Sequence, residues 1–210
     1  MKILALGAHP DDIEFGCGAT LMKFARAGHD IFLYVATYGE LGGDRMVRKK
    51  EQLEAVDFIG AKDVFWGEFP DCELPLSRHL ITKIEDVIND VQPEYIFVHN
   101  SEDTHQDHRA LSTATLSASR YVPNVLYYEG PSTLAFSPNV YMNVEDTVDD
   151  KMTLLEKHAS QIRRVNVKMP EVSILDIAAS SARFRGIQAR MKIAEAFRSV
   201  RLFINVPECE

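Results

Sequence analysis

The sequence lacks several features that mark particular classes of protein. Its three cysteines cannot all pair within one chain, and none belongs to a Cys-x-x-Cys pair. This usage is typical of a reducing compartment, so we expect a cytoplasmic protein. No apolar run approaches the roughly 20 residues that cross a bilayer. The first run, residues 3–8, stops too soon for a signal peptide, so we expect no membrane partner.

Clusters of basic residues are also scarce. The formal net charge is -8, and the longest Lys/Arg run is Arg48-Lys49-Lys50 within a mixed-charge stretch. The sequence therefore predicts no nucleic-acid partner, while a small anionic substrate stays compatible with it. Hydrophobic residues make up 46% and charged residues 26%, which is the usual balance of a globular protein and argues against disorder.

Short β-rich runs alternate with helical patterns in the first half of the chain. Parallel strands need crossover connections, so this alternation predicts a mostly parallel sheet with helices on both faces. The expected fold class is α/β, Rossmann-like and doubly wound, with strand order 3-2-1-4-5 plus added C-terminal strands. The expected strands lie at 2–8, 30–37, 63–67 and 95–98, and the helices between them at 16–28, 46–59 and 81–91.

The second half of the sequence is less regular. The Pro-rich stretch 130–140 is typical of a long loop, and the stretch 161–179 has no clear period. Both are candidates for a lid or for a contact within a homo-oligomer. The length of 210 residues favours one domain, residues 1–210. The remaining expected elements are helices at 107–120, 146–160 and 180–199 and strands at 125–128, 140–144 and 202–206.

Two polar clusters follow the first and fourth expected strands. They are His9-Pro10-Asp11-Asp12 and His105-Gln106-Asp107-His108. In the expected strand order these strands are neighbours, and ligands of such sheets bind at the carboxyl ends of strands where the order reverses. Either cluster alone is compatible with a simple turn or helix start. Together they indicate a metal site in one crevice.

The donor types suit Zn²⁺, which takes imidazole nitrogen and carboxylate oxygen as ligands. A catalytic zinc uses three protein ligands and keeps one position open, and we expect His9, Asp12 and His108 to supply them. Asp11 is then free to hold a water molecule and take its proton. Fe²⁺ is an alternative metal.

The remaining histidine of the second cluster has a different expected role. Asp107 would orient His105, and the imidazole would face the developing oxyanion or the leaving amine. Spacing alone leaves His105 and His108 interchangeable as metal ligand and acid.

At these residues the sequence resembles the LmbE-like or PIG-L family, zinc-dependent deacetylases that act on N-acetylglucosamine-type substrates. The likeness spans nearly the whole chain, and its most specific part is the pair of motifs His-Pro-Asp-Asp and His-x-Asp-His. The supporting matches are Gly16-Cys17-Gly18 with Thr20-Leu21, Thr37-x-Gly39-Glu40, Arg48-x-x-Glu51, His158-x-Ser160-Gln161, Arg185-Gly186 and Ala194-Glu195-Ala196-Phe197.

The resemblance implies His108 as the metal ligand and His105, paired with Asp107, as the oxyanion-stabilising or acid group, which settles the alternative that spacing leaves open. It also implies that Arg48, Glu40 and Asp71 contact sugar hydroxyls or an attached phosphate. By themselves these three residues are ambiguous, since each is also typical of a helix surface, a turn or a loop cap.

We therefore expect a metal-dependent hydrolase that removes the acetyl group from an N-acetylated sugar, sugar conjugate or sugar nucleotide. A related alternative is an amidase for another N-acyl or thiol-conjugated amino sugar. A remote one is a nucleotide-binding Rossmann-like module, because Gly16-Cys17-Gly18 and Glu40 mimic part of a dinucleotide fingerprint, although Leu21 replaces its third glycine. A structural metal site would use all four positions for ligands, which argues against a scaffold protein.

Overall fold

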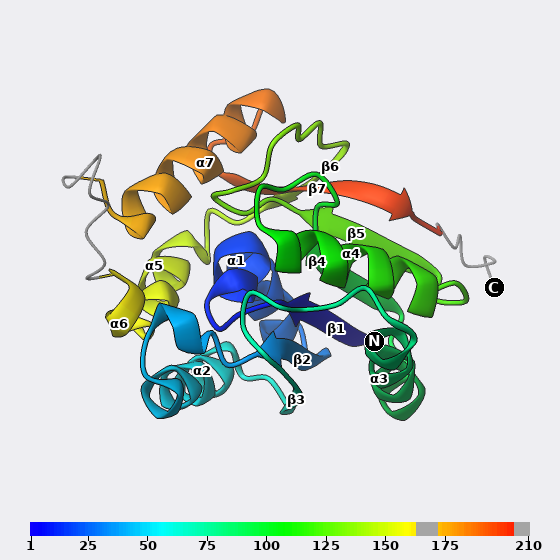
Figure 1. Ribbon diagram of the computed structural model, residues 1–210. Helices are drawn as coiled ribbons and strands as arrows, with labels where there is room; N and C mark the ends of the chain where they lie inside the picture. Colours follow the sequence, from blue (N-terminus) through cyan, green and yellow to red (C-terminus); the bar gives the residue numbers. More distant parts are fainter. Residues whose placement is uncertain (163–171, 204–210) are drawn as a thin grey trace.

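The computed structural model describes residues 1–162 and 172–203 and contains a seven-stranded sheet in the order β3-β2-β1-β4-β5-β7-β6 (Figure 1). The first five strands are parallel, and β7 is antiparallel to both of its neighbours. This confirms the predicted order with added C-terminal strands. The strands are β1 (Lys2–Gly7), β2 (Asp30–Thr37), β3 (Asp63–Phe69), β4 (Tyr95–His99), β5 (Asn124–Tyr128), β6 (Val140–Asn143) and β7 (Ala194–Arg201).

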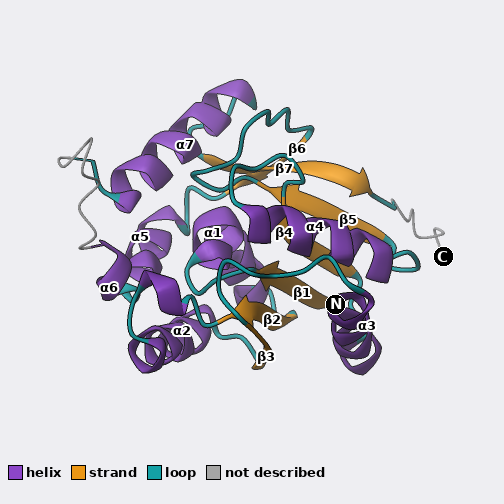
Figure 2. Ribbon diagram, in the orientation of Figure 1, coloured by secondary structure: helices purple, strands orange, loops and turns teal. Residues whose placement is uncertain are grey.

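Helices cover both faces of the sheet (Figure 2). Leu4 and Leu6 of β1 pack with α3 and α4, whereas the alternate residues Ile3 and Ala5 pack with α1 and α2. Because both faces of β1 are buried, its sequence is almost continuously apolar. The helices are α1 (Asp12–Arg26), α2 (Arg45–Ile59), α3 (Arg78–Val91), α4 (Gln106–Ala118), α5 (Val148–Glu156), α6 (Ala159–Ile162) and α7 (Ile174–Gln188), with a 3-10 turn η1 (Glu40–Gly42).

Several helices begin and end at residues that satisfy free backbone groups. The side chains of Asp44 and Ser77 accept N–H groups in the first turns of α2 and α3, and Ser173 and Asp176 form a reciprocal capping box at α7. Helix α2 ends at Gly60 in the left-handed conformation. These local signals are why the predicted bounds of α2 are nearly correct.

The C-terminal part of the chain differs from the sequence prediction. The predicted helix over 180–199 is wrong, because the chain is helical over Ile174–Gln188 and then extended in β7. Strand β7 lies between β5 and β6. It carries the buried residue Glu195, whose Oε1 accepts a hydrogen bond from Lys151 Nζ at 2.6 Å. Those partners are distant in sequence, so no local pattern reveals them. Most of the predicted strand at 202–206 lies outside the described residues.

Other boundaries shift by smaller amounts. Helix α1 begins at Asp12 and not at 16, and the helix predicted at 146–160 is divided into α5 and α6. Within the stretch 161–179, helix α7 occupies the C-terminal part, and residues 163–171 lie outside the described chain.

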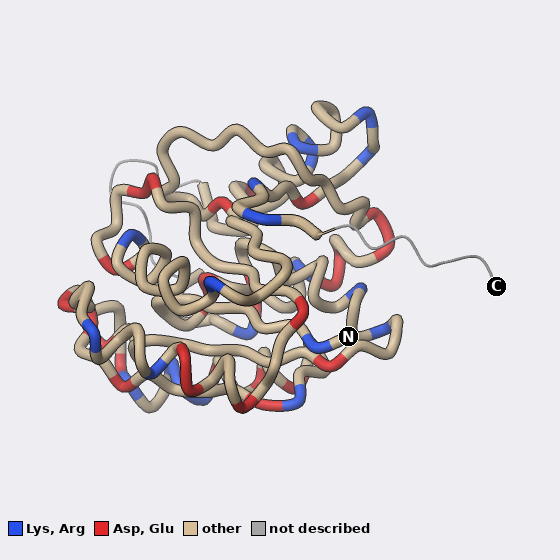
Figure 3. Tube along the Cα trace, turned by 90° about the vertical axis from the view of Figure 1, so that its right-hand side faces the viewer, with Lys and Arg blue, Asp and Glu red and all other residues tan. Residues whose placement is uncertain are grey.

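Acidic and basic residues are interspersed along the chain (Figure 3). In the two ranges that the structure covers, no helix has the length and apolarity of a membrane span. The expectations about nucleic acid and membranes stay predictions.

Helix α1 approaches the sheet closely at Gly16. A Cβ atom at this position would lie 2.1 Å from Cδ2 of Tyr128, whose ring is fully buried and whose hydroxyl donates to the Leu6 carbonyl at 2.7 Å. The ring therefore sets the height of α1 above the sheet, and with it the position of the first helical turn.

We expect Gly16→Ala to lower the free energy of unfolding by about 1–3 kcal/mol, because the added methyl forces the helix or the Tyr128 ring to move. This loss is larger than the stabilisation of up to about 1 kcal/mol that alanine gives a helix interior relative to glycine. Urea denaturation followed by circular dichroism measures the change. Gly130→Ala is the control, since its Cβ would meet only Thr133 Oγ1, at 3.8 Å, among described atoms. Equal denaturation midpoints for the two variants would contradict the prediction.

Candidate functional site

The first polar cluster forms a tight loop between β1 and α1. Asp11 is the N-cap of α1 and has φ 93°, in the left-handed region that residues other than glycine rarely adopt. The backbone N–H of His9 donates to Asp12 Oδ2 at 2.7 Å, which closes the turn. As a result the side chains of His9, Asp11 and Asp12 line one cavity at the carboxyl edge of the sheet.

The second cluster begins α4, and β4 pairs directly with β1. His105 is the N-cap, and its Nδ1 accepts the backbone N–H of Asp107 at 3.3 Å. The His9 ring centroid lies 4.6 Å from that of His105 and 5.4 Å from that of His108. The two clusters therefore lie together, as the strand order predicts.

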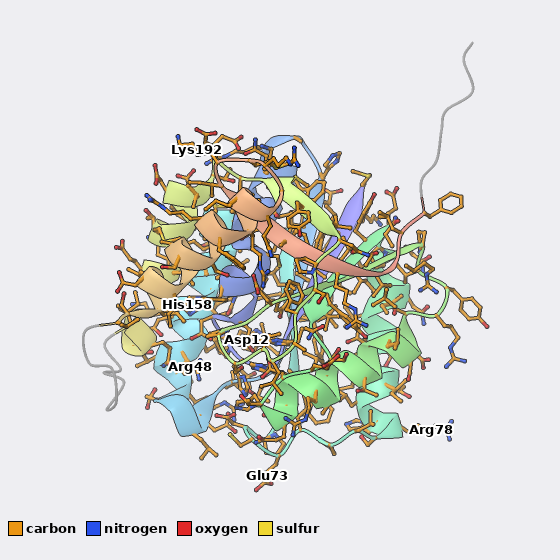
Figure 4. All side chains as sticks on the ribbon, turned by 90° about the horizontal axis from the view of Figure 1, so that it is seen from above. Asp12, Arg48, Glu73, Arg78, His158 and Lys192 are labelled. Carbon is orange, nitrogen blue, oxygen red and sulfur yellow. The ribbon has the colours of Figure 1, made fainter. Side chains whose placement is uncertain are left out.

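The imidazoles meet at the carboxylate of Asp12, which is labelled near the middle of the view in Figure 4. Its Oδ2 lies 3.2 Å from His9 Nδ1, and its Oδ1 lies 3.4 Å from His108 Nε2. His99 Nε2 also lies 3.2 Å from Oδ2, but this nitrogen accepts the N–H of Ala8 at 3.1 Å. His99 is thus a buried neighbour of Asp12 whose Nε2 is already bonded to the backbone.

Further carboxylates hold the outer nitrogens of the two imidazoles. His9 Nε2 lies 3.1 Å from Asp71 Oδ1 and 3.2 Å from Asp107 Oδ2. On the other side, His108 Nδ1 lies 3.2 Å from Asp103 Oδ2. These contacts keep His9 Nδ1 and His108 Nε2 directed at Asp12, and such carboxylate partners are typical of metal-binding histidines.

The surrounding carboxylates make the cluster favour positive charge. Burial alone would lower the pKa of His9, yet the three carboxylates around its ring raise it to about 12. Burial alone would also lower the pKa of His108, but Asp12 and Asp103 raise it to about 9. The same carboxylates would stabilise a bound divalent cation. Two imidazoles with one carboxylate form a donor set that fits Zn²⁺. The residues present therefore fit a metal.

The cavity beside this cluster has a volume of about 280 Å³. The predicted site residues line it, except for Asp107 and Glu40. Asp107 is fully buried behind His9, and Glu40 is exposed at the edge of its loop. Arg48, expected either on the helix surface or at the substrate, is buried, and its guanidinium donates to two backbone carbonyls.

The predicted contact between the Asp107 carboxylate and His105 is not the one observed. The carboxylate accepts the N–H groups of Cys72 at 2.8 Å and Leu74 at 3.2 Å, and it faces His9. Side chains two residues apart at a helix start point in different directions, so one of the pair turns inward and the other faces the cavity. Asp107 therefore orients His9.

Glu40 and Asp71 connect two loops at the cavity. Glu40 Oε1 accepts the N–H of Asp71 at 3.1 Å, and Asp71 Oδ2 accepts the N–H of Leu41 at 2.9 Å. This reciprocal pair holds the loop after β2 against the loop after β3. Glu40 thus reaches the cavity only through Asp71.

Comparison with known proteins identifies the family of this chain. The sequence profile of PIG-L, described as GlcNAc-PI de-N-acetylase, matches residues 4–119. The chain belongs to the PIG-L family. The uncharacterised deacetylase YaiS of Escherichia coli is 38% identical to it over 167 residues, covering 75% of this chain and 90% of that protein.

Two further similar proteins share less of their sequence with this chain. The diacetylchitobiose deacetylase of Thermococcus kodakarensis is 24% identical over 186 residues, covering 76% of this chain and 70% of that protein. The crystal structure of the conserved protein TT1542 from Thermus thermophilus has a TM-score of 0.85 at 24% identity and covers 99% of this chain and 98% of its own. This second likeness supports the fold alone.

Asp103 also belongs to this site, although the sequence alone did not identify it. Its Oδ1 accepts the N–H of His105 at 2.8 Å, and its Oδ2 lies beside His108 and accepts from Thr133 Oγ1 at 3.1 Å. One buried carboxylate therefore holds both histidines of the second cluster and the loop after β5. Its place in the polar loop five residues before His108 was the available signal.

We expect Asp103→Ala to weaken Zn²⁺ binding by about 10- to 100-fold, because the His108 ring loses the partner that orients it. Competition against a chromophoric chelator measures the dissociation constant. Asp146→Ala, which removes an exposed carboxylate paired with Lys23, should leave the constant unchanged. Equal affinities of Asp103→Ala and wild type would refute an orienting role.

Proposed function

We propose that the chain is a metal-dependent deacetylase that hydrolyses the N-acetyl amide of an N-acetylglucosamine-type sugar, sugar conjugate or sugar nucleotide. The observation that carries this proposal is the contact of the Asp12 carboxylate with both His9 and His108, beside the Asp11 carboxylate at the cavity wall. Membership of the PIG-L family supports the reaction. The diacetylchitobiose deacetylase relative supports the class of substrate.

In this proposal His9, Asp12 and His108 hold Zn²⁺, with Fe²⁺ as the alternative. A bound divalent cation would polarise the amide carbonyl and lower the pKa of a water molecule to about 7. The Asp11 side chain is 29% exposed, and its Oδ1 lies 3.6 Å from Arg48 Nη2. Its partial burial raises the pKa of Asp11 and Arg48 opposes the rise, so the carboxylate is suited to accepting a proton.

His105 is suited to the electrophilic side of the same reaction. Because its Nδ1 accepts the N–H of Asp107, the proton of the neutral ring belongs on Nε2. An Nε2–H group in the cavity can donate a hydrogen bond to a developing oxyanion, while the proton that Asp11 takes from water can pass to the leaving amine. Asp107 supports the site through His9 and through this backbone N–H.

The substrate-binding roles of Arg48, Glu40 and Asp71 stay part of the proposal. Arg48 and Asp71 line the cavity and present polar groups to a sugar, while Glu40 acts through Asp71. An amidase for another N-acyl or thiol-conjugated amino sugar would use the same groups, and a substrate screen separates the two. A nucleotide-binding role is disfavoured, since Cβ atoms at Gly16 and Gly18 would meet Tyr128 and Leu154 in the core.

The base assignment predicts that Asp11→Asn loses turnover by about 100- to 10,000-fold, because the neutral amide cannot take a proton from water. The measurement is acetate release from N-acetylglucosamine derivatives by the zinc-loaded protein. Elemental analysis should find unchanged metal in the variant. Undiminished turnover would sink the assignment, and no acetate from any N-acetylated sugar in the wild type would sink the proposed reaction.

Metal removal gives a separate prediction. Dialysis against a chelator should abolish acetate release, and stoichiometric Zn²⁺ or Fe²⁺ should restore it. His9→Ala should neither retain the metal nor recover activity, because it removes a ligand of the cluster. Full turnover by protein shown to be metal-free would rule out metal dependence.

A further inference from the structure

The backbone at Asp11 is held in a conformation that its side chain disfavours. Its φ of 93° and ψ of -21° lie in the left-handed region. Strain of this kind persists only where surrounding contacts hold the chain, and it often marks a functional position. The Pro10–Asp11 peptide unit immediately precedes this residue, so the orientation of that unit fixes where the Asp11 side chain points.

Two side chains of α2 contact the two polar atoms of this peptide unit. Arg48 Nη2 donates to the Pro10 carbonyl at 2.7 Å, and the Asp11 N–H donates to Gln52 Oε1 at 3.4 Å. Arg48 and Gln52 are four residues apart on α2 and therefore lie on one face of the helix. Both are buried, with exposed fractions of 4% and 0%. The peptide unit cannot rotate without losing one of these contacts.

The direction of the Gln52 amide is determined by a third residue. Gln52 Nε2 donates to Glu14 Oε1 at 2.6 Å, and Glu14 is fully buried in the first turn of α1. A carboxylate only accepts hydrogen bonds, so the amide nitrogen must face Glu14 and the amide oxygen must face Asp11. Gln52 therefore connects the Asp11 N–H to the start of the same helix.

Arg48 reaches the loop only because Gly39 leaves room for it. A Cβ at Gly39 would lie 1.9 Å from Arg48 Nη1, and this nitrogen donates to the Gly39 carbonyl at 2.7 Å. Gly39 also has φ 65°, which suits glycine. A polar face of α2 is thus directed at the loops around the cavity.

We propose that Gln52 is a positioning residue for Asp11. Gln52 and Arg48 together clamp the Pro10–Asp11 peptide unit. The inference rests on the proposed function, in which Asp11 takes the proton of the attacking water. Loss of the Gln52 contact lets the peptide unit rotate and moves the carboxylate away from that water. Gln52 does not line the cavity, so substrate affinity should change little. The effect therefore falls on kcat and not on KM.

The variant that tests this is Gln52→Met, which keeps the length of the side chain and removes both hydrogen bonds. We expect kcat for acetate release to fall by about 10- to 100-fold, with KM within about threefold and unchanged metal content. Val56→Ala is the matched control, because Val56 is a buried residue one turn further along α2 without a role in the clamp. It should lower the melting temperature and leave kcat unchanged.

A second variant and a structural measurement keep the proposal testable if Gln52→Met does not fold. Gln52→Asn retains the amide but is one methylene too short to reach both partners, so kcat should also fall. Crystal structures of the variants should show Asp11 leaving its positive φ. An unchanged kcat, an equal loss in Val56→Ala, or an unchanged φ at Asp11 would overturn the clamp. A wild type that releases no acetate contradicts the proposed function, and the φ comparison still decides the clamp.

Discussion

Three buried imidazoles converge on the single carboxylate of Asp12, and the rest of the site is arranged around that convergence. The imidazoles come from the loop after β1, the end of β4 and the first turn of α4, so they meet only because β1 and β4 are neighbours. The height of Asp12 depends on α1, which the Tyr128 ring holds at Gly16. The geometry of the candidate metal site therefore depends on how α1 packs against the sheet.

The second requirement of this site is a supply of negative charge behind the imidazoles. Asp71, Asp103 and Asp107 approach the outer nitrogens of His9 and His108 from three different segments. Burying carboxylates is costly unless each is paired and hydrogen-bonded. Here backbone N–H groups and imidazoles provide those partners, and the resulting crevice favours a cation.

Helix α2 both packs on the hydrophobic core and holds a loop of the site. Its apolar residues Ala55, Val56 and Ile59 pack on the sheet, while Arg48 and Gln52 contact the Pro10–Asp11 peptide unit. A strained loop needs such external contacts, because its own backbone would relax without them. The proposed base and its support are thus separated by about forty residues in sequence, a distance over which local propensity carries no information.

The sequence by itself determined the order of the first five strands, the convergence of the two polar clusters and the kinds of donor in the cavity. These follow from apolar periodicity, from crossover rules and from the motifs themselves. Only the tertiary structure decided that β7 is a strand, that Asp107 orients His9 and not His105, and that Asp103 supports His108. The reason is physical: pairing with β5 and β6 overrides local propensity, and the direction of a side chain depends on which distant backbone groups it meets.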